Sequence, residues 1–390
     1  MLHLERLKTA IDAMSHLTAE RQQQCESDTA QALRWLTDAP EPAELRARLV
    51  PVVAGGGDWA GALPATAAPL DARLVAAGDP PHGAVLIAVD GSQVYPDPHA
   101  AVLYYLLQIG GLAFRYDGSR PTPYSCESLH FRDDELYDAQ GYPISSEQVG
   151  MRRLVREMEY LAELTTLERH VAPAAPLMAL TDGPLLWPYI ERSRADSAAL
   201  EAYLAAMSEI RQAGGLPVGY VARPGGRTLV ELLWAGQLSP ADIPGRLADN
   251  PLRGLTDAIL MAHFLRPGER SAWFSRPSAT NQRQADHGHE VWFCYVNVGT
   301  EHAPVIARLE TPHWGAIDED AITALHVILL HQARVLNGYP YALARAHEEA
   351  LVTTADKAAL DSEIQRHILE QGIVVRPSEK AQQKAYLGRR

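Results

Sequence analysis

Two aspartates follow short apolar segments and stand directly before a glycine. Residues 84–89 are apolar without alternation, which is typical of a strand buried on both faces of a sheet, and Asp90-Gly91-Ser92 comes next. A second short apolar strand is predicted at 177–181, and Asp182-Gly183 follows it. If the two strands are neighbours, the two carboxylates lie about 5 Å apart and repel each other unless a divalent cation joins them.

Oxygen ligands of this kind suit magnesium or manganese. Near a phosphodiester, such a site activates water and stabilises the leaving oxygen. The alternative interpretation is that each Asp-Gly pair forms an independent turn. The sequence contains no Gly-x-x-x-x-Gly-Lys pattern, so it lacks the phosphate-binding loop of nucleotide hydrolases.

The sequence predicts a helix over residues 146–170. Ser145 and Gln148 have the spacing of a capping box, and apolar residues recur at helical spacing from Met151 onward. Glu159 lies at the border of the buried face of this helix. Glu157 and Glu163, on the same helix, are alternatives to Glu159.

The remaining pattern predicts a mixed α/β sheet layered by helices. Residues 101–109 and 112–116 are expected to form a hairpin split by Gly110-Gly111, and Asp117-Gly118-Ser119 an exposed turn. Further on we expect, in order, a helix over 195–213, a strand over 216–222, a helix from about 256 to 264, two antiparallel strands over 291–298 and 305–309, a helix over 321–336 and another beginning near 339.

Composition restricts the class of protein. The chain has 390 residues, 47% of them hydrophobic, and a formal net charge of −13, which argues against indiscriminate electrostatic binding of nucleic acid. Three widely separated cysteines indicate a reducing compartment and no structural zinc. The sequence shows neither a membrane-spanning run nor a signal-peptide pattern, so we expect a cytoplasmic protein without a membrane partner.

We expect three regions along the chain. Residues 1–82 form an N-terminal helical arm, with apolar residues at helical spacing, and a linker that contains Gly55-Gly56-Gly57. Residues 83–370 form the main domain, and residues 371–390 a polar, basic C-terminal tail.

Between about residues 84 and 365 the chain resembles the NurA nuclease family. The resemblance rests on separated pieces that occur in the family's order and spacing: Val89-Asp90-Gly91-Ser92, Arg156-Glu157-Met158-Glu159-Tyr160, Thr181-Asp182-Gly183, Leu255-Thr256-Asp257, Pro267-Gly268-Glu269-Arg270-Ser271, and the long segment from Asn337 to His347. The last segment is the most specific of these pieces.

The resemblance implies a ribonuclease H-like mixed sheet flanked by helices, with the N-terminal helical arm added, and a homodimer. It implies a nuclease dependent on manganese, or on magnesium, that digests single-stranded DNA with 5′-to-3′ exonuclease action. Its implied partner is a HerA-type hexameric ATPase translocase, with which it would work in DNA end resection.

The same resemblance assigns roles to individual residues. Asp90 and Asp182 would be the central metal ligands, Glu159 the helix carboxylate facing them, and Asp257 a further acid. His347 would be a metal ligand or a group near the scissile phosphate.

Two further residues are candidates for substrate binding. Arg223 stands where the family commonly has a lysine, and it would contact phosphate as a planar fork. Tyr95 follows the first aspartate and could stack against an unpaired base, or else belong to the core. Pro184 replaces the usual serine after the second Asp-Gly, which changes the turn but not the carboxylate.

Alternatives remain open at this point. Asp257 beside Thr256 could serve only to cap its helix, and His347 could be a packed histidine in an alanine-rich helix. At the level of function, the alternatives to a deoxyribonuclease are a catalytically decayed docking or regulatory subunit of the translocase, and a phosphatase of small substrates that uses the same carboxylates.

Overall fold

The computed structural model describes residues 4–54, 59–100, 102–138 and 141–373. The chain forms two compact units. The first comprises Met1–Pro80, Gly183–Trp187 and Val218–Pro340, and the second Pro81–Asp182, Pro188–Pro217 and Tyr341–Arg390. Both combine strands with helices, which confirms the predicted mixed α/β class.

The second unit is built on four strands in the order β6-β3-β4-β5. Strands β3, β4 and β5 form an antiparallel meander, and β6 pairs with β3 in parallel after a helical crossover. This arrangement is compatible with a ribonuclease H-like sheet. The elements of the unit are β3 (Val85–Val94), β4 (Tyr105–Arg115), β5 (Thr122–His130), α3 (Asp133–Leu136), α4 (Ser146–Val171), β6 (Leu177–Asp182), α5 (Arg194–Gln212), α12 (Tyr341–Ala350) and α13 (Thr354–Glu370).

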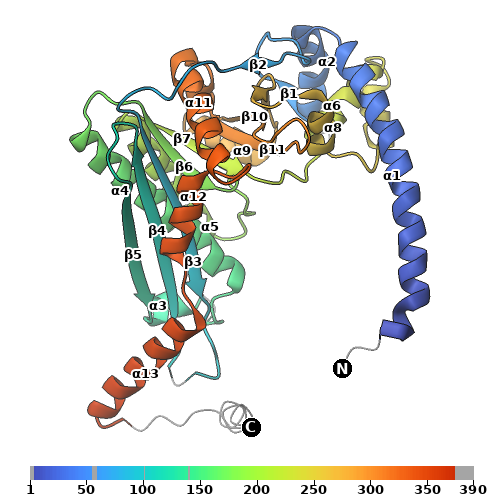
Figure 1. Ribbon diagram of the computed structural model, residues 1–390. Helices are drawn as coiled ribbons and strands as arrows, with labels where there is room; N and C mark the ends of the chain where they lie inside the picture. The colour runs from blue at the N-terminus through green and yellow to red at the C-terminus, as the bar shows by residue number, and fades with distance from the viewer. Residues whose placement is uncertain (1–3, 55–58, 101, 139–140, 374–390) are drawn as a thin grey trace. The chain divides into compact units, whose positions relative to one another are not determined.

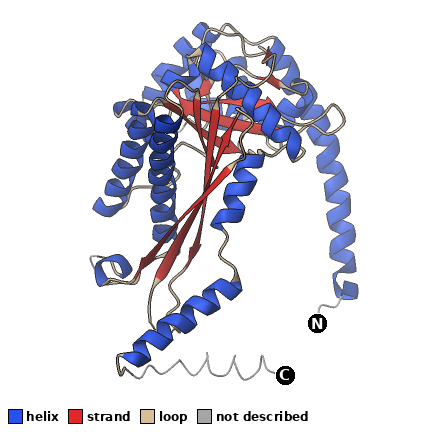
Figure 2. Cartoon of the chain, turned by 60° about the vertical axis from the view of Figure 1, so that its left-hand side comes forward, coloured by secondary structure: helices blue, strands red, loops and turns tan. Residues whose placement is uncertain are grey.

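Helices cover both faces of these strands. Helices α4 and α5 pack together behind β3 and β4 in the view of Figure 1, and α12 crosses in front of them. Figure 2 shows the long strands of this unit as one twisted layer between helices. The capping box predicted for α4 is present: the Ser145 hydroxyl accepts the Gln148 N–H, and the Gln148 side chain accepts the Ser145 N–H.

The hairpin predicted at Gly110-Gly111 is wrong. Strand β4 runs without interruption through both glycines, and its hairpin partner is β5. The physical reason is space, because a Cβ at Gly110 would overlap the backbone of α12. The turn predicted at Asp117 is confirmed, since its carboxylate accepts the Ser119 N–H and Gly118 has a φ of +86°.

The first unit contains an antiparallel strand path, β1-β9-β10-β11-β7, and most of the remaining helices. Strand β7 spans the division of the two units, and its residues from Val218 belong here. The elements are η1 (Leu4–Leu7), α1 (Lys8–Thr37), α2 (Pro42–Ala54), β1 (Leu63–Pro64), β2 (Leu74–Val75), β7 (Gly215–Val221), α6 (Thr228–Gln237), α7 (Ile243–Arg246), η2 (Leu247–Asp249), α8 (Asp257–Phe264), β8 (Glu269–Arg270), β9 (Phe274–Ser275), α9 (Ala279–Asp286), β10 (Val291–Asn297), β11 (Ile306–Pro312), α10 (His313–Ala316) and α11 (Glu319–Val335).

The N-terminal arm is helical, as predicted. The C-terminal part of α1 contributes Ala32 and Leu36 to the core of the first unit, where it packs against α6 and α8. The apolar residues near the start of the arm, among them Leu7 and Ile11, are exposed. The linker glycines 55–57 and tail residues 374–390 lie outside the described residues.

Within the described ranges, no helix is long and apolar enough to cross a membrane. Cys25, Cys126 and Cys294 are all free thiols.

Candidate active site

The two Asp-Gly aspartates occupy equivalent positions on neighbouring strands. The parallel register between β3 and β6 pairs Val89 with Thr181, and Asp90 and Asp182 follow this pair directly. Adjacent strands lie about 4.8 Å apart, so the two carboxylates project from neighbouring positions on the two strands. Asp90 is half-buried and Asp182 exposed.

Gly91 lets a third carboxylate reach this edge. A Cβ at Gly91 would lie against the Glu157 carboxylate and 2.9 Å from Ile109 Cδ1, which is closer than a real Cβ tolerates. The space that Gly91 leaves open is therefore filled by Glu157 from α4. The Arg153 guanidinium pairs with Glu157 and donates a hydrogen bond of 3.0 Å to the Gly91 carbonyl, which fixes the carboxylate against β3.

The electrostatics place Glu157 in one acidic group with the two aspartates. The pKa of Glu157 is raised from 4.5 to about 7: burial raises it most, the charge of Arg153 lowers it, and the charges of Asp90 and Asp182 raise it. The side chain is only 3% exposed. A bound divalent cation relieves this kind of repulsion between like charges.

The structure places Glu157, and not the predicted Glu159, against the Gly91 position of β3. Glu159 is 43% exposed and lies 3.6 Å from Arg156. Glu163 is also exposed and pairs with the same arginine at 2.7 Å. Glu159, at the border of the apolar pattern, is exposed beside Arg156. Glu157 is buried, and the absence of a side chain at Gly91 on β3 makes room for it.

His347 meets Asp90 from the other face of the sheet. It lies on α12, and its Nδ1 is 2.6 Å from Asp90 Oδ2, while Asp90 Oδ1 accepts the Gly91 N–H at 2.8 Å. The His347 side chain is 60% exposed. The carboxylate thus orients the imidazole through Nδ1.

Asp257 has a different environment from the other predicted acids. It belongs to the first unit and is fully buried. Its carboxylate accepts the N–H groups of Leu229 and Val230 at the start of α6, and the hydroxyls of Thr228 and Tyr295. Its own helix is capped by Thr256. The carboxylate caps the neighbouring helix α6 and has no open side for a metal or a substrate.

The two substrate-binding candidates lie in different units. Tyr95 follows β3 in the second unit, is 43% exposed, and its hydroxyl accepts a hydrogen bond of 2.7 Å from Gln93. It is therefore a surface residue and not part of the core. Arg223 is exposed in the loop after β7, in the first unit.

The donors have the chemistry that a divalent cation requires, but they do not form a preformed cage. Asp90 and Asp182 supply carboxylate oxygens from neighbouring strands, and Glu157 supplies them from α4, near enough for the charges of the two aspartates to raise its pKa. In the described part of the chain, no three histidine, cysteine, aspartate or glutamate side chains are already arranged around one point as ligands. The fit to a metal thus rests on charge and ligand type.

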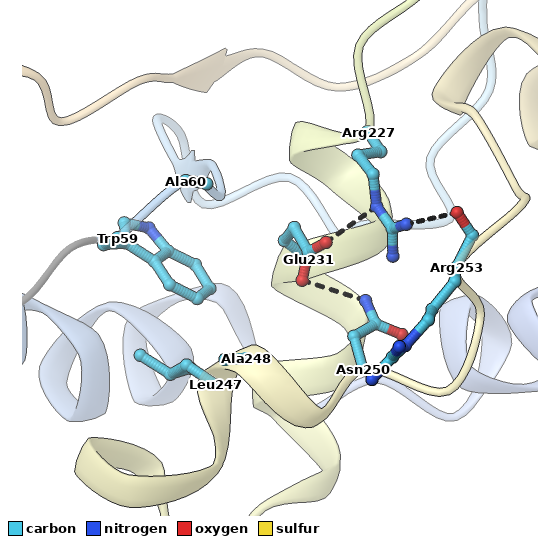
Figure 3. A pocket seen from close by; sticks show the side chains of 8 residues that line it. All are labelled: Trp59, Ala60, Arg227, Glu231, Leu247, Ala248, Asn250 and Arg253. Carbon is cyan, nitrogen blue, oxygen red and sulfur yellow. Dashed lines mark hydrogen bonds and ion pairs between the residues drawn. The ribbon is translucent and has the colours of Figure 1, made fainter.

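The first unit also contains the following two cavities, whose lining residues all belong to that unit. One, of about 270 Å³, lies between Trp59 and a polar network in which Glu231 pairs with Arg227 and accepts from Asn250 (Figure 3). The other, of about 560 Å³, is bordered by Arg270 and His326.

Comparison with known proteins identifies the family. A model of the NurA domain matches residues 84–352. The chain belongs to the NurA family. No curated protein matches it significantly. All the acids of the sheet edge, and His347, fall within the NurA domain.

Two solved NurA structures are similar to the chain. A crystal structure of NurA has 14% sequence identity and a TM-score of 0.38, with 75% of this chain and 90% of the other covered. A crystal structure of NurA with manganese has 12% identity and a TM-score of 0.42, with 91% and 98% covered.

The sequence left Glu157 and Glu163 as unranked alternatives to Glu159 and did not assign Arg153 to the site. A usable signal was present, because Arg153 and Glu157 are four residues apart on a helix and so face the same way. Gly91 does not form a turn: β3 continues through it, and its missing side chain makes room for Glu157.

Proposed function

We propose that this NurA-family protein is a metal-dependent deoxyribonuclease that hydrolyses phosphodiester bonds at the edge of β3 and β6. The observation that carries the proposal is the register that makes Asp90 and Asp182 neighbours, with Glu157 buried beside them. Two neighbouring aspartates whose charges also act on a buried glutamate are unfavourable for a protein alone and favourable for cation-assisted phosphate chemistry.

Asp90, Asp182 and Glu157 would hold the cation, which we propose to be manganese, or magnesium in its place. When bound, it supplies Lewis acidity that activates water and offsets the negative charge of the phosphate. His347 remains an alternative ligand, because its contact with Asp90 occupies only Nδ1 and a metal-bound histidine commonly pairs its other ring nitrogen with a carboxylate.

The protein's own residues have separate tasks. Arg153 holds the Glu157 carboxylate against the Gly91 carbonyl and so keeps it at the strand edge. Asp90 orients the His347 ring. Through Nε2, His347 would accept a proton from the attacking water or order that water against the phosphate. Asp257 has no catalytic task in this proposal.

The finer assignments follow from family membership. The proposed substrate is single-stranded DNA or DNA ends, cleaved by endonuclease and 5′-to-3′ exonuclease action, and Tyr95 and Arg223 would contact it. The proposed partner is a HerA-type translocase in double-strand break end processing, and the proposed assembly is a homodimer. A net charge of −13 supports the need for a partner, because the protein alone attracts DNA weakly.

The test is digestion of a labelled single-stranded oligonucleotide by the full chain. We expect cleavage with manganese, none with chelator, and none with Asp90→Asn. Asp117→Asn is the matched control, since Asp117 stands in the same Asp-Gly-Ser triplet but forms an exposed turn, and it should cleave normally. Intact DNA throughout a manganese series, with folded protein, would contradict the proposal.

A second candidate is a docking subunit whose site has decayed. The observation in its favour is that the described acids do not already surround a common point. It predicts that Asp90→Asn and the wild-type chain stimulate the partner ATPase equally and that neither cleaves DNA. Cleavage of a nucleotide monophosphate in preference to the oligonucleotide would instead indicate a phosphatase.

A further inference from the structure

At Gly110 on β4, the backbone of α12 lies directly against the strand. A Cβ at this position would lie 2.7 Å from the Glu349 carbonyl carbon, and closer still to the Ala346 oxygen and the Ala350 nitrogen. These are backbone atoms of a helix, so they cannot rotate away as the end of a side chain would. Any larger residue at 110 must push α12 outward.

Two side chains next to Gly110 attach the same end of α12. The Ser92 hydroxyl donates to the Ala350 carbonyl, and the Gln108 amide donates to the Glu349 carbonyl at 3.3 Å. Ser92 and Gln108 are register partners, as are Asp90 and Gly110. These four residues therefore form one patch on the sheet face that α12 covers, and we call it the helix seat.

The helix seat determines where His347 lies. His347 follows Ala346, whose carbonyl is over Gly110, and its imidazole reaches Asp90, the register partner of Gly110. A displacement of α12 from the seat would separate Nδ1 from the carboxylate, because a hydrogen bond of 2.6 Å has little tolerance.

We propose that Gly110 is a positioning residue for His347: the absence of a side chain there lets α12 approach β4 closely enough to set the imidazole on Asp90. This inference rests on the proposed nuclease function, in which His347 assists hydrolysis. It also explains why Gly110-Gly111 interrupts an apolar run without forming a turn.

Gly111 provides a matched control in the same strand. Its side-chain position faces the opposite side of the sheet, where a Cβ would meet Leu164 Cδ1 at 2.7 Å and Tyr124 Cβ at 3.5 Å. The nearest atom belongs to the end of a flexible side chain on α4. Gly110→Ala and Gly111→Ala are therefore the same chemical change at adjacent positions, but only the first meets α12.

The experiment measures kcat and KM for cleavage of a single-stranded oligonucleotide with manganese, using the full chain. We expect Gly110→Ala to lower kcat by about 100-fold with little change in KM, and Gly111→Ala to have a much smaller effect. In a His347→Gln background, Gly110→Ala should cause no further loss. Equal losses for the two glycine variants, or an undiminished further loss in the His347→Gln background, would overturn the proposal.

A second variant and a second readout cover the cases of poor folding or absent activity. Ser92→Ala removes a seat hydrogen bond without crowding, and it too should lower kcat only when His347 is present. Hydrogen exchange of the α12 amides should be faster in Gly110→Ala than in Gly111→Ala. If the wild-type chain cleaves nothing, the proposed function fails, while unequal exchange would still support the helix seat and equal exchange would refute it.

Discussion

His347 Nδ1 lies 2.6 Å from Asp90 Oδ2, which joins α12 to β3 across 257 positions of the chain. The contact links the most specific segment of the NurA resemblance to the first Asp-Gly aspartate. A histidine held by a carboxylate has one nitrogen fixed and the other available for proton transfer. The imidazole is 60% exposed, so a substrate could reach it.

Replacing this imidazole should reduce catalysis and leave substrate binding intact. For His347→Gln we expect kcat to fall by about 100-fold or more, because general acid–base groups contribute on that order, with KM little changed. His170→Gln is the control, since His170 is exposed at the end of α4 and bonds only to its own helix. Steady-state cleavage kinetics check this, and an unchanged kcat would remove His347 from the reaction.

The helix carboxylate can be assigned by comparing two neutral substitutions. Glu157→Gln should abolish manganese-dependent cleavage, because it removes the buried carboxylate beside Asp90 and Asp182. Glu159→Gln should retain nearly full activity, since Glu159 contacts only Arg156 among the ion pairs described. Activity assays on both variants decide the matter, and the reverse pattern would restore Glu159 to the site.

Asp257 should behave as a structural residue. Asp257→Asn breaks the set of donors that converge on a fully buried carboxylate, so we expect a loss of about 3 kcal/mol in the free energy of unfolding. Asp90→Asn should change that free energy by less than about 1 kcal/mol. Urea unfolding measures both. A stable but inactive Asp257→Asn protein would contradict the structural assignment.

Buried His326 should make stability depend on pH. Burial and the charge of Arg270 lower its pKa from 6.5 to about 4. The unfolded chain therefore takes up this proton near pH 6.5 and the folded chain only near pH 4, so stability is lost as the pH falls through this window. The loss is about 3 kcal/mol for a shift of this size. His326→Gln should remove this component, and a pH-independent difference between the two proteins would contradict it.

Local signals in the sequence were sufficient for most elements around the site. The capping box at Ser145 and Gln148 placed the start of α4, and the unbroken apolar segments before Asp90 and Asp182 predicted β3 and β6. These features are local because a cap or a buried strand depends mainly on its own residues.

The errors arose where distant segments meet. Gly110-Gly111 has the composition of a turn, and only the later helix α12 explains it as a place of close packing. Glu157 could be distinguished from Glu159 only once Gly91 was seen to make room for it. Asp257 looked like a cap for its own helix or an acid of the site, but its carboxylate caps α6, which begins 29 residues earlier. Such tertiary partners are not encoded in local spacing.

The most direct test of a cation shared by the acids at the β3–β6 edge is anomalous diffraction from manganese-soaked crystals of the full chain. We predict a manganese peak contacted by the carboxylates of Asp90 and Asp182, with Glu157 beside it, and loss of that peak in Asp182→Asn. Well-ordered wild-type crystals with manganese bound only elsewhere, or a peak that persists in Asp182→Asn, would contradict the account.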